Sequence, residues 1–306
     1  MDFREQLLLL KEQLLFKDTI RDIDSFDNIV IAGMGGSGIV GKIFQELYSE
    51  KPVYLVDDYK CPTFVSRKSL FIAISYSGNT EETISALAQA KAKRAYTVSI
   101  SAGGKLSGYA EQSIKIPNSE LQPRCAIGYM LMPLIRSFSL ANSQEITKAY
   151  KLLMGLDDDS GECEKHAKRI CSSSRIPVIY GVSPFKSVAY RWKTQFNENG
   201  KVLAYSSSFP ELNHNDTMAL AETYDRDRFY FFVFESGEEK ISKRIAVTAR
   251  ITGAEFNMIE PKGTSTFEKL FYLIHYGDYV SYHLGLLRKI DPADVSLIQR
   301  LKKMIA

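Results

Sequence analysis

The sequence predicts an α/β protein made of two αβα sandwich subdomains, each with a parallel sheet. Short apolar runs alternate with helical patterns from residue 28 to residue 100, as expected for parallel strands joined by crossover helices. A second alternating series starts near residue 177, after an increasingly polar stretch at 140–160. The chain has 306 residues, which is enough for two domains. We therefore expect a first domain over residues 1–155 and a second over residues 156–306.

Composition is that of a folded protein with a large core. Hydrophobic residues make up 45% of the chain and charged residues 25%, a balance that does not indicate disorder. The net charge of +3 is small, and Lys and Arg are scattered along the chain. Signatures of RNA-binding modules are absent. We expect no nucleic-acid partner, and we interpret the mild positive excess as a field that attracts an anionic substrate.

The cysteines and the first residues indicate a soluble, cytoplasmic protein without a metal centre or a membrane anchor. The four histidines supply no ligand cluster, and no C-x-x-C pair occurs among the cysteines, which are Cys61, Cys125, Cys163 and Cys171. We expect these thiols to be reduced. The chain starts with an amphipathic pattern rather than a signal peptide. Nor does any apolar run approach the roughly 20 residues that span a bilayer.

The elements of the first domain follow from the hydrophobic pattern. Leucines at helical spacing predict a helix over residues 2–17 that packs on this domain. Strands are predicted near 28–33, 52–56, 69–74, 96–100 and 113–117. Helices are predicted near 38–49, 80–92 and 126–139. In such sheets, ligands bind outside the carboxyl ends of the strands.

The loop after the first strand is a candidate anion site. Residues 33–38 read G-M-G-G-S-G and a helical pattern begins at once, so backbone N–H groups at the helix start can hold an anion. Three of these glycines also match the dinucleotide fingerprint G-x-G-x-x-G, and Asp57 or Asp58 is an acidic residue about 20 positions later. This loop alone leaves open a nicotinamide-nucleotide site, another phosphate loop or a tight turn without a ligand.

A second loop favours a sugar-phosphate type of ligand. Residues 75–80 read S-Y-S-G-N-T, between an apolar strand and a helix that starts at Glu81. A dinucleotide site does not need these hydroxyls, whereas a phosphomonoester has several oxygens that Ser and Thr can bind. The two loops follow neighbouring strands of one sheet, so we expect them to form one phosphate pocket.

The two loops together resemble a known family. S-Y-S-G-N-T-E-E-T at 75–83, preceded by G-x-G-G-S-G, is the signature pair of sugar-isomerase (SIS) domains. More narrowly, nearly the whole chain resembles the bifunctional phosphoglucose/phosphomannose isomerases. The resemblance implies two SIS-type subdomains, which are flavodoxin-like or Rossmann-like sandwiches. We expect six residues of the loops to bind the phosphate: Gly35, Gly36, Ser37, Ser75, Ser77 and Thr80.

The second domain is expected to repeat the architecture without the two phosphate loops. Strands are predicted near 177–181, 202–205, 228–234 and 255–259. Helices are predicted near 185–196, 238–250 and 265–288, followed by a terminal helix after Pro292. We interpret Trp192 as a core anchor and the apolar stripe of the long helix as core or dimer interface. The acidic run at 157–159 is expected to cap a helix start.

Arg124 is the candidate for binding the reacting part of the substrate. It stands just before the helix near 126–139, so its side chain can turn toward a strand-end crevice. A solvated loop arginine is the ordinary interpretation. However, P-R-x-A-x-G-Y, at 123–129 here, is where the similar isomerases place a substrate-facing arginine. A guanidinium is always charged and offers a rigid fork of donors to an oxyanion.

Three further residues are candidates for proton transfer. Glu198 lies between two Asn where a helix ends, and a carboxylate there opposes the helix macrodipole, which weakens a plain surface interpretation. His214 lies in E-L-N-H-N, which the family contributes to the active site of the neighbouring subunit. Lys302 matches the family's active-site lysine near the chain end. The ordinary alternatives are an exposed loop histidine and a solvated terminal lysine, and Lys303 is the other lysine of the pair.

The resemblance implies an aldose–ketose isomerase that interconverts glucose 6-phosphate, and mannose 6-phosphate, with fructose 6-phosphate through an enediolate. It implies a homodimer, no cofactor and no metal. Relatives often carry a Thr upstream of the final helix face that is associated with accepting mannose, and only Ser296 could replace it here.

Two other classes of protein stay open at this point. A non-catalytic sugar-phosphate sensor would keep both loops but would not need Glu198, His214 and Lys302 together. An NAD-dependent oxidoreductase would use the first loop with Asp57 or Asp58.

Overall fold

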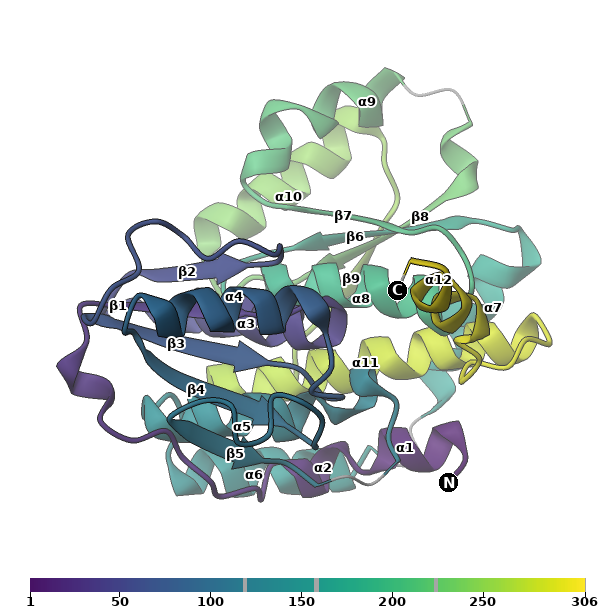
Figure 1. Ribbon diagram of the computed structural model, residues 1–306. Helices are drawn as coiled ribbons and strands as arrows, with labels where there is room; N and C mark the ends of the chain where they lie inside the picture. The colour runs from purple at the N-terminus through teal and green to yellow at the C-terminus, as the bar shows by residue number, and fades with distance from the viewer. Residues whose placement is uncertain (118–119, 157–159, 223–224, 306) are drawn as a thin grey trace. The chain divides into compact units, whose positions relative to one another are not determined.

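The computed structural model of the chain describes residues 1–117, 120–156, 160–222 and 225–305 (Figure 1). The chain divides into two compact units. The first contains Leu8–Met154, and the second contains Asp2–Leu7 together with the chain from Gly155 onward. The expected domain junction between residues 155 and 156 stays a prediction. The acidic run at 157–159 lies outside the described residues.

The first unit contains a five-stranded, all-parallel sheet in the order β2-β1-β3-β4-β5. Its strands are β1 (Asn28–Ala32), β2 (Val53–Val56), β3 (Ser69–Ile74), β4 (Tyr96–Ser101) and β5 (Gln112–Lys115). Every residue of β3 is buried, which explains its uninterrupted apolar run. This agrees with the parallel sandwich that the sequence predicts.

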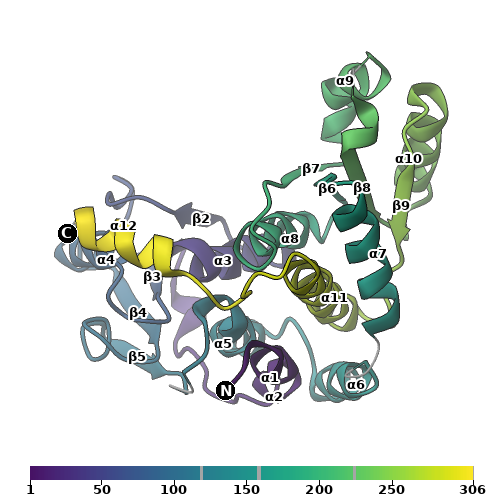
Figure 2. The same cartoon turned by 90° about the vertical axis from the view of Figure 1, so that its right-hand side faces the viewer.

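The helices of the first unit cover both faces of this sheet. They are α3 (Gly35–Leu47), α4 (Glu81–Ala92), α5 (Ile127–Ser137) and α6 (Ser143–Met154). Figure 2 shows α4 on one face and α3 with α5 on the other. The connection from β1 therefore runs in the opposite direction to the connection from β3. The point between these two neighbouring strands is the topological switch point, where open α/β sheets bind ligands.

The N-terminal segment differs from the single helix predicted over residues 2–17. It forms two short helices, α1 (Phe3–Leu8) and α2 (Leu10–Gln13), and residues 2–7 belong to the second unit. The leucine spacing predicts helical structure but not the interruption at Leu9, because different parts of the segment pack on different units.

The second unit contains a four-stranded parallel sheet in the order β7-β6-β8-β9, which repeats the order of the first four strands of the other sheet. Its strands are β6 (Ile176–Gly181), β7 (Tyr205–Ser208), β8 (Phe229–Phe234) and β9 (Phe256–Ile259). As predicted from its apolar run, β8 is an interior strand. The repeated order supports an internal duplication.

One strand prediction in this sheet is wrong. A strand was expected near 202–205, but β7 starts at Tyr205 and continues through three serines. Leu203, which resembles a strand residue, is 72% exposed. Because β7 is an edge strand, its backbone pairs with β6 without requiring apolar side chains.

The helices of the second unit are α7 (Ser160–Ser172), α8 (Lys186–Glu198), α9 (Asp216–Glu222), α10 (Glu239–Thr252), α11 (Thr266–Leu287) and α12 (Ser296–Ile305). In Figures 1 and 2, α9 and α10 lie on one face of this sheet and α7, α8 and α11 on the other. Trp192 of α8 is fully buried, as a core anchor should be. The apolar stripe of α11 is also buried within the single chain, as core residues are.

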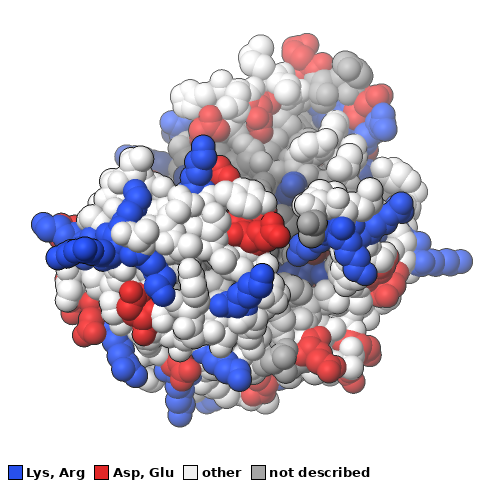
Figure 3. Space-filling view, in the orientation of Figure 1, with Lys and Arg blue, Asp and Glu red and all other residues white. Residues whose placement is uncertain are grey.

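No helix in the described part of the chain is long and apolar enough to cross a membrane. All four cysteines are free, and three of them are buried. On the face drawn in Figure 3, Lys and Arg side chains are interspersed with Asp and Glu and form no continuous basic surface.

Candidate active site

Two helix N-termini meet at the switch point of the first unit. Strands β1 and β3 are hydrogen-bonded neighbours, with Ile31 opposite Ile72 and Ala32 opposite Ala73. One leads into α3 and the other into α4. Neither N-cap residue of these helices makes a side-chain capping hydrogen bond. Both helix starts can therefore direct backbone N–H groups and a positive dipole end toward an anion.

Close packing explains the glycines of the first loop. A Cβ atom at Gly38 would lie 2.6 Å from the carbonyl oxygen of Gly33, and a Cβ at Gly36 would lie 3.3 Å from Cα of Arg124. Gly35 has φ of +54°, a left-handed conformation that favours glycine. The loop is therefore a compact turn whose far side is in contact with the segment that carries Arg124.

The hydroxyls of the second loop form a connected set. Oγ of Ser75 lies 2.8 Å from Oγ1 of Thr80, and Ser75 Oγ also accepts the N–H of Gly78 at 3.1 Å. Ser77 Oγ accepts the N–H of Asn79 at 3.2 Å. Ser75 is buried, whereas Ser77 is exposed. Ser77 therefore offers the most accessible hydroxyl of the loop.

A hydrogen bond links the two loops. Oγ of Ser37, at the start of α3, accepts the backbone N–H of Tyr76 at 3.3 Å and donates to Sδ of Met130 at 3.4 Å. The structure thus brings the six predicted phosphate-binding residues to one place in the first unit.

Arg124 also lies at this place. It sits in a 3₁₀ turn, η2 (Pro123–Ala126), and only 3% of it is exposed, so the interpretation as a solvated loop arginine does not hold. Its Nη1 donates to Oε1 of Gln122 at 3.4 Å.

Gln13, which no sequence motif identifies, holds this turn. Gln13 of α2 is fully buried; its Nε2 donates to the carbonyl oxygen of Cys125 at 2.7 Å, and its Oε1 accepts the N–H of Gly128 at 2.8 Å. A polar residue at an interior position of an apolar helical pattern was the only available signal. Its partners lie more than 100 positions away in the chain, and no local pattern identifies them.

The other three candidates lie on separate elements of the second unit. Glu198 is half-buried and is the last residue of α8, as expected, and Nζ of Lys201 donates to its carbonyl oxygen. His214 is exposed and ends a 3₁₀ turn, η3 (Glu211–His214). Lys302 and Lys303 are both exposed on α12, where no described residue is buried.

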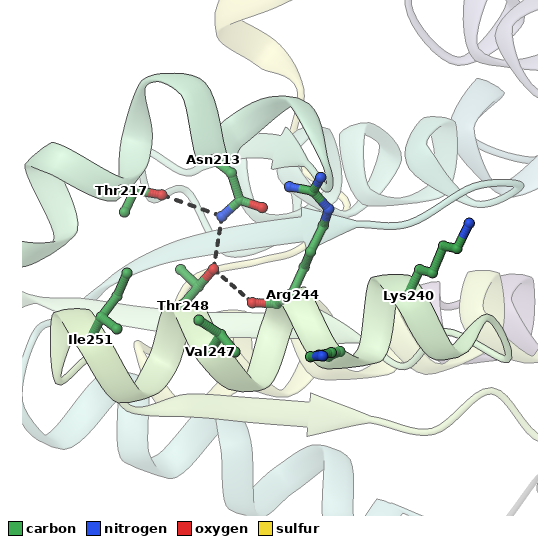
Figure 4. Close-up of a pocket in the computed structure, with 8 residues that line it drawn as sticks. Asn213, Thr217, Lys240, Arg244, Val247, Thr248 and Ile251 are labelled. Atoms are coloured by element: carbon green, nitrogen blue, oxygen red, sulfur yellow. Dashed lines mark hydrogen bonds between the residues drawn. The ribbon is translucent and has the colours of Figure 1, made fainter.

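The segment that carries His214 is anchored to α10. Figure 4 shows the amide of Asn213 between Thr217 and Thr248, and its Nδ2 donates to Thr248 Oγ1 at 2.7 Å. These residues line a cavity of about 490 Å³ that contains none of the predicted site residues. Nearby, burial raises the pKa of Asp216, against hydrogen bonds with Tyr180 and Ser207 that lower it.

The described residues offer no group of three or more His, Cys, Asp or Glu side chains that could hold a metal ion. Asp57 and Asp58, which a dinucleotide site would use, are exposed just beyond the end of β2.

The chain is similar to known proteins over its whole length. Residues 23–129 match the SIS domain, and residues 160–305 match the bacterial phospho-glucose isomerase C-terminal SIS domain. The bifunctional phosphoglucose/phosphomannose isomerase of Thermoplasma volcanium is 56% identical over 306 residues, which cover 100% of both chains. The enzyme of the same name from Thermoplasma acidophilum is 54% identical, over 100% of this chain and 98% of that one.

A solved structure shares the fold at low identity. A hypothetical protein of Thermus thermophilus superposes with a TM-score of 0.74 at 16% identity, covering 98% of this chain and 87% of that chain. The identity to the two Thermoplasma enzymes extends over the whole length of the sequence. The chain therefore belongs to the family of bifunctional phosphoglucose/phosphomannose isomerases.

Proposed function

We propose that the protein interconverts glucose 6-phosphate and mannose 6-phosphate with fructose 6-phosphate through an enediolate, without a metal ion. As a member of its family it is an aldose–ketose isomerase of sugar phosphates. The observation that carries the proposal is the pair of uncapped helix N-termini at the carboxyl ends of β1 and β3. Such a pair, lined with hydroxyls, suits one phosphomonoester.

The phosphate is bound by the two loops. Backbone N–H groups of Gly35 and Gly36 donate at the start of α3, and the exposed hydroxyl of Ser77 donates from the second loop. Ser37, Ser75 and Thr80 complete the anchor. The hydroxyls of Ser75 and Thr80 bond to each other, and Ser37 Oγ accepts the N–H of Tyr76, which joins the two loops. Prior ordering of donors reduces the entropy lost on binding.

The reaction needs one base that moves a proton between C2 and C1, and donors that open the sugar ring. We assign the base to Glu198, because a carboxylate can accept the proton from one carbon and return it to the other on the same face of a planar enediol. His214 and Lys302 exchange protons with the ring oxygen and with the C1 or C2 hydroxyl. Arg124 stabilises the enediolate, because a guanidinium stays charged throughout.

We propose that the active form is a homodimer in which His214 serves the site of the neighbouring subunit. The exposure of His214 supports this, as does the hydrogen bond from the neighbouring Asn213 to Thr248, which anchors its segment to α10. We place this dimer in the cytoplasm.

Mannose acceptance is assigned to Ser296 at the start of α12, the helix that carries Lys302. Its backbone N–H donates to Oδ1 of Asp294 at 2.9 Å, which fixes the helix start. The hydroxyl takes the place of the threonine that relatives often carry in this stretch.

Ketose formation from each sugar phosphate, with excess EDTA present, tests the proposal. The expected result is fructose 6-phosphate from both substrates at rates that EDTA does not change, and negligible turnover of free glucose. The ketose is measured after quenching, so that the chelator cannot affect a coupling enzyme. A rate that collapses in EDTA and returns with a divalent cation would contradict the metal-free route, and equal turnover of free glucose would contradict the phosphate anchor.

A further inference from the structure

Helices α8 and α11 pack unusually close to one another at two glycines of α11. A Cβ atom at Gly277 would lie 2.3 Å from Nε1 of Trp192, and a Cβ at Gly285 would lie 2.6 Å from the carbonyl oxygen of Asn199. The first contact is in the middle of α8, and the second is at the residue that follows Glu198. The views in Figures 1 and 2 both place the two helices side by side. Because a Cβ fits at neither glycine, the distance between the helices is fixed over the second half of α8, from Trp192 to its end.

A buried ion pair lies beside the first of these contacts. Nη2 of Arg191 donates to both carboxylate oxygens of Asp278, at 2.9 and 2.7 Å, and Nε2 of Gln195 donates to Oδ1 of Asp278 at 2.7 Å. Arg191 and Gln195 are fully buried, and Asp278 is 5% exposed. A buried ion pair contributes little net stability but tolerates only a narrow geometry. This one fixes the rotation and the axial position of α8 against α11.

Further contacts hold the end of α8. Nδ2 of Asn199 donates to Oγ of Ser281 at 2.9 Å, and that hydroxyl donates to the carbonyl oxygen of Asp278 at 2.9 Å. Nη1 of Arg288 donates to the carbonyl oxygens of Gly200 and Lys201. The residues that follow Glu198 are therefore held by side chains of α11 and of Arg288 just after it.

We propose that Asp278, Ser281 and Gly285 are positioning residues that set the location of the Glu198 carboxylate. This inference rests on the proposed function, in which Glu198 transfers the proton between C2 and C1. One carboxylate has to reach two adjacent carbons, so a small displacement of the helix end affects both half-reactions. A misplacement of about 1 Å can reduce a rate by about 10²-fold. The three residues act through α8 and do not touch the substrate.

Two substitutions alter the contacts that hold the end of α8 without changing Glu198 itself. Ser281→Ala removes the acceptor of Asn199, and we expect kcat to fall about tenfold. Gly285→Ala places a methyl group against the carbonyl oxygen of Asn199, and we expect kcat to fall about a hundredfold. KM for glucose 6-phosphate should stay within about twofold in both, because the phosphate loops are unchanged. Gly161→Ala in α7, where a Cβ would meet nothing within 4 Å, is the matched control and should match wild type.

Combination with Glu198→Gln separates positioning from general damage. If Ser281 and Gly285 act through the carboxylate, adding either substitution to Glu198→Gln should not lower the residual rate further. A purely structural effect would persist in the double variants and would follow the folded fraction measured by circular dichroism. That result would overturn the inference.

The remaining outcomes distinguish this inference from the proposed function. Suppose that Glu198→Gln is inactive but that folded Ser281→Ala and Gly285→Ala keep the wild-type kcat. This result would leave Glu198 as the base and overturn the positioning role. A loss confined to Gly285→Ala also overturns it, because the added methyl would lie 3.0 Å from Cγ of Pro292 as well. Full activity of Glu198→Gln overturns the assignment of the base, and the positioning role with it.

Discussion

The buried side chain of Gln13 joins helix α2 to the first turn of α5, where its Oε1 accepts the backbone N–H of Gly128 at 2.8 Å. The same amide donates to the carbonyl oxygen of Cys125, one residue after Arg124. A Cβ at Gly128 would lie 2.6 Å from Cβ of Gln13, so the two segments are in direct contact. A residue near the start of the chain therefore fixes the turn that presents Arg124.

Gln13→Met keeps the size of this side chain but removes its hydrogen bonds to three backbone groups, the carbonyl of Cys125 and the N–H groups of Gly128 and Tyr129. We expect the free energy of unfolding to fall by about 1–3 kcal/mol. We also expect kcat to fall several-fold, because the turn with Arg124 loses its support. Urea denaturation and steady-state kinetics measure the two effects, with the exposed Gln144→Met as the control. Unchanged stability and rate would show that the turn is held by other contacts.

Ser77→Ala tests the phosphate anchor. The substitution removes one hydrogen bond to a charged oxygen, so binding of glucose 6-phosphate should weaken by roughly 1.5–3 kcal/mol. Titration calorimetry measures this loss, and the exposed Ser107→Ala serves as the control on a neighbouring loop. Because Ser77 Oγ also accepts the N–H of Asn79, the thermal midpoint is measured alongside. Wild-type affinity in Ser77→Ala would remove this residue from the anchor.

Glu198→Gln tests the base. Glutamine keeps the shape of the side chain but cannot accept a proton at its oxygen with comparable basicity, so turnover should fall by about 10²–10⁴ while binding stays near normal. Exchange of the sugar C2 hydrogen with deuterated water, followed by proton NMR, should disappear in parallel. Near-wild-type turnover or exchange would mean that another group moves the proton.

Mixed dimers test whether His214 acts across an interface. Glu198→Gln and His214→Ala proteins should each be inactive, and subunit exchange between them should restore part of the activity. Recovery is expected because one of the two sites in a mixed dimer then receives both intact residues. Differently tagged subunits, purified in tandem, confirm that the mixed species formed. Absence of recovery in such verified dimers would place His214 in the site of its own subunit.

Burial of His166 should make the free energy of unfolding depend on pH. Its ring packs among aromatic side chains of the second unit, with Nδ1 2.7 Å from Oη of Tyr230, and burial lowers its pKa from 6.5 to about 4. Between pH 4 and pH 6.5 the His166 imidazole is protonated in the unfolded chain and neutral in the folded chain. The contribution of the neutral His166 to the free energy of unfolding is therefore fully present above pH 6.5, and it is lost as the pH falls toward 4. After an allowance for partial exposure it amounts to roughly 2 kcal/mol.

His166→Phe keeps an aromatic ring in this place and should flatten that part of the pH profile. Urea denaturation between pH 4.5 and 7 measures the slope. Some slope should remain, because burial also lowers the pKa of His283. An unchanged slope in His166→Phe would assign the effect to other groups.

Local sequence patterns are sufficient to predict the fold class, the position of most strands and the family. The run at 69–74 coincides with β3, because a strand buried on both faces is apolar throughout and is bounded by polar loops. Glu198 was placed at the end of a helix for a similarly local reason, since Gly200 and the asparagines interrupt the helical pattern. The two loop motifs identify the family because their residues are contiguous.

The residues that support those motifs can be identified only from contacts between distant parts of the chain. Asp278 is a polar residue within the apolar pattern of α11, yet it is buried against Arg191, 87 positions earlier. Gln13 contacts the turn of Arg124 across a similar distance in sequence, and the serines of β7 form a strand because β6 is beside them. Hydrophobic periodicity reports which face of an element is buried. It cannot report which distant element covers that face, because the partner is chosen by the packing of the whole unit.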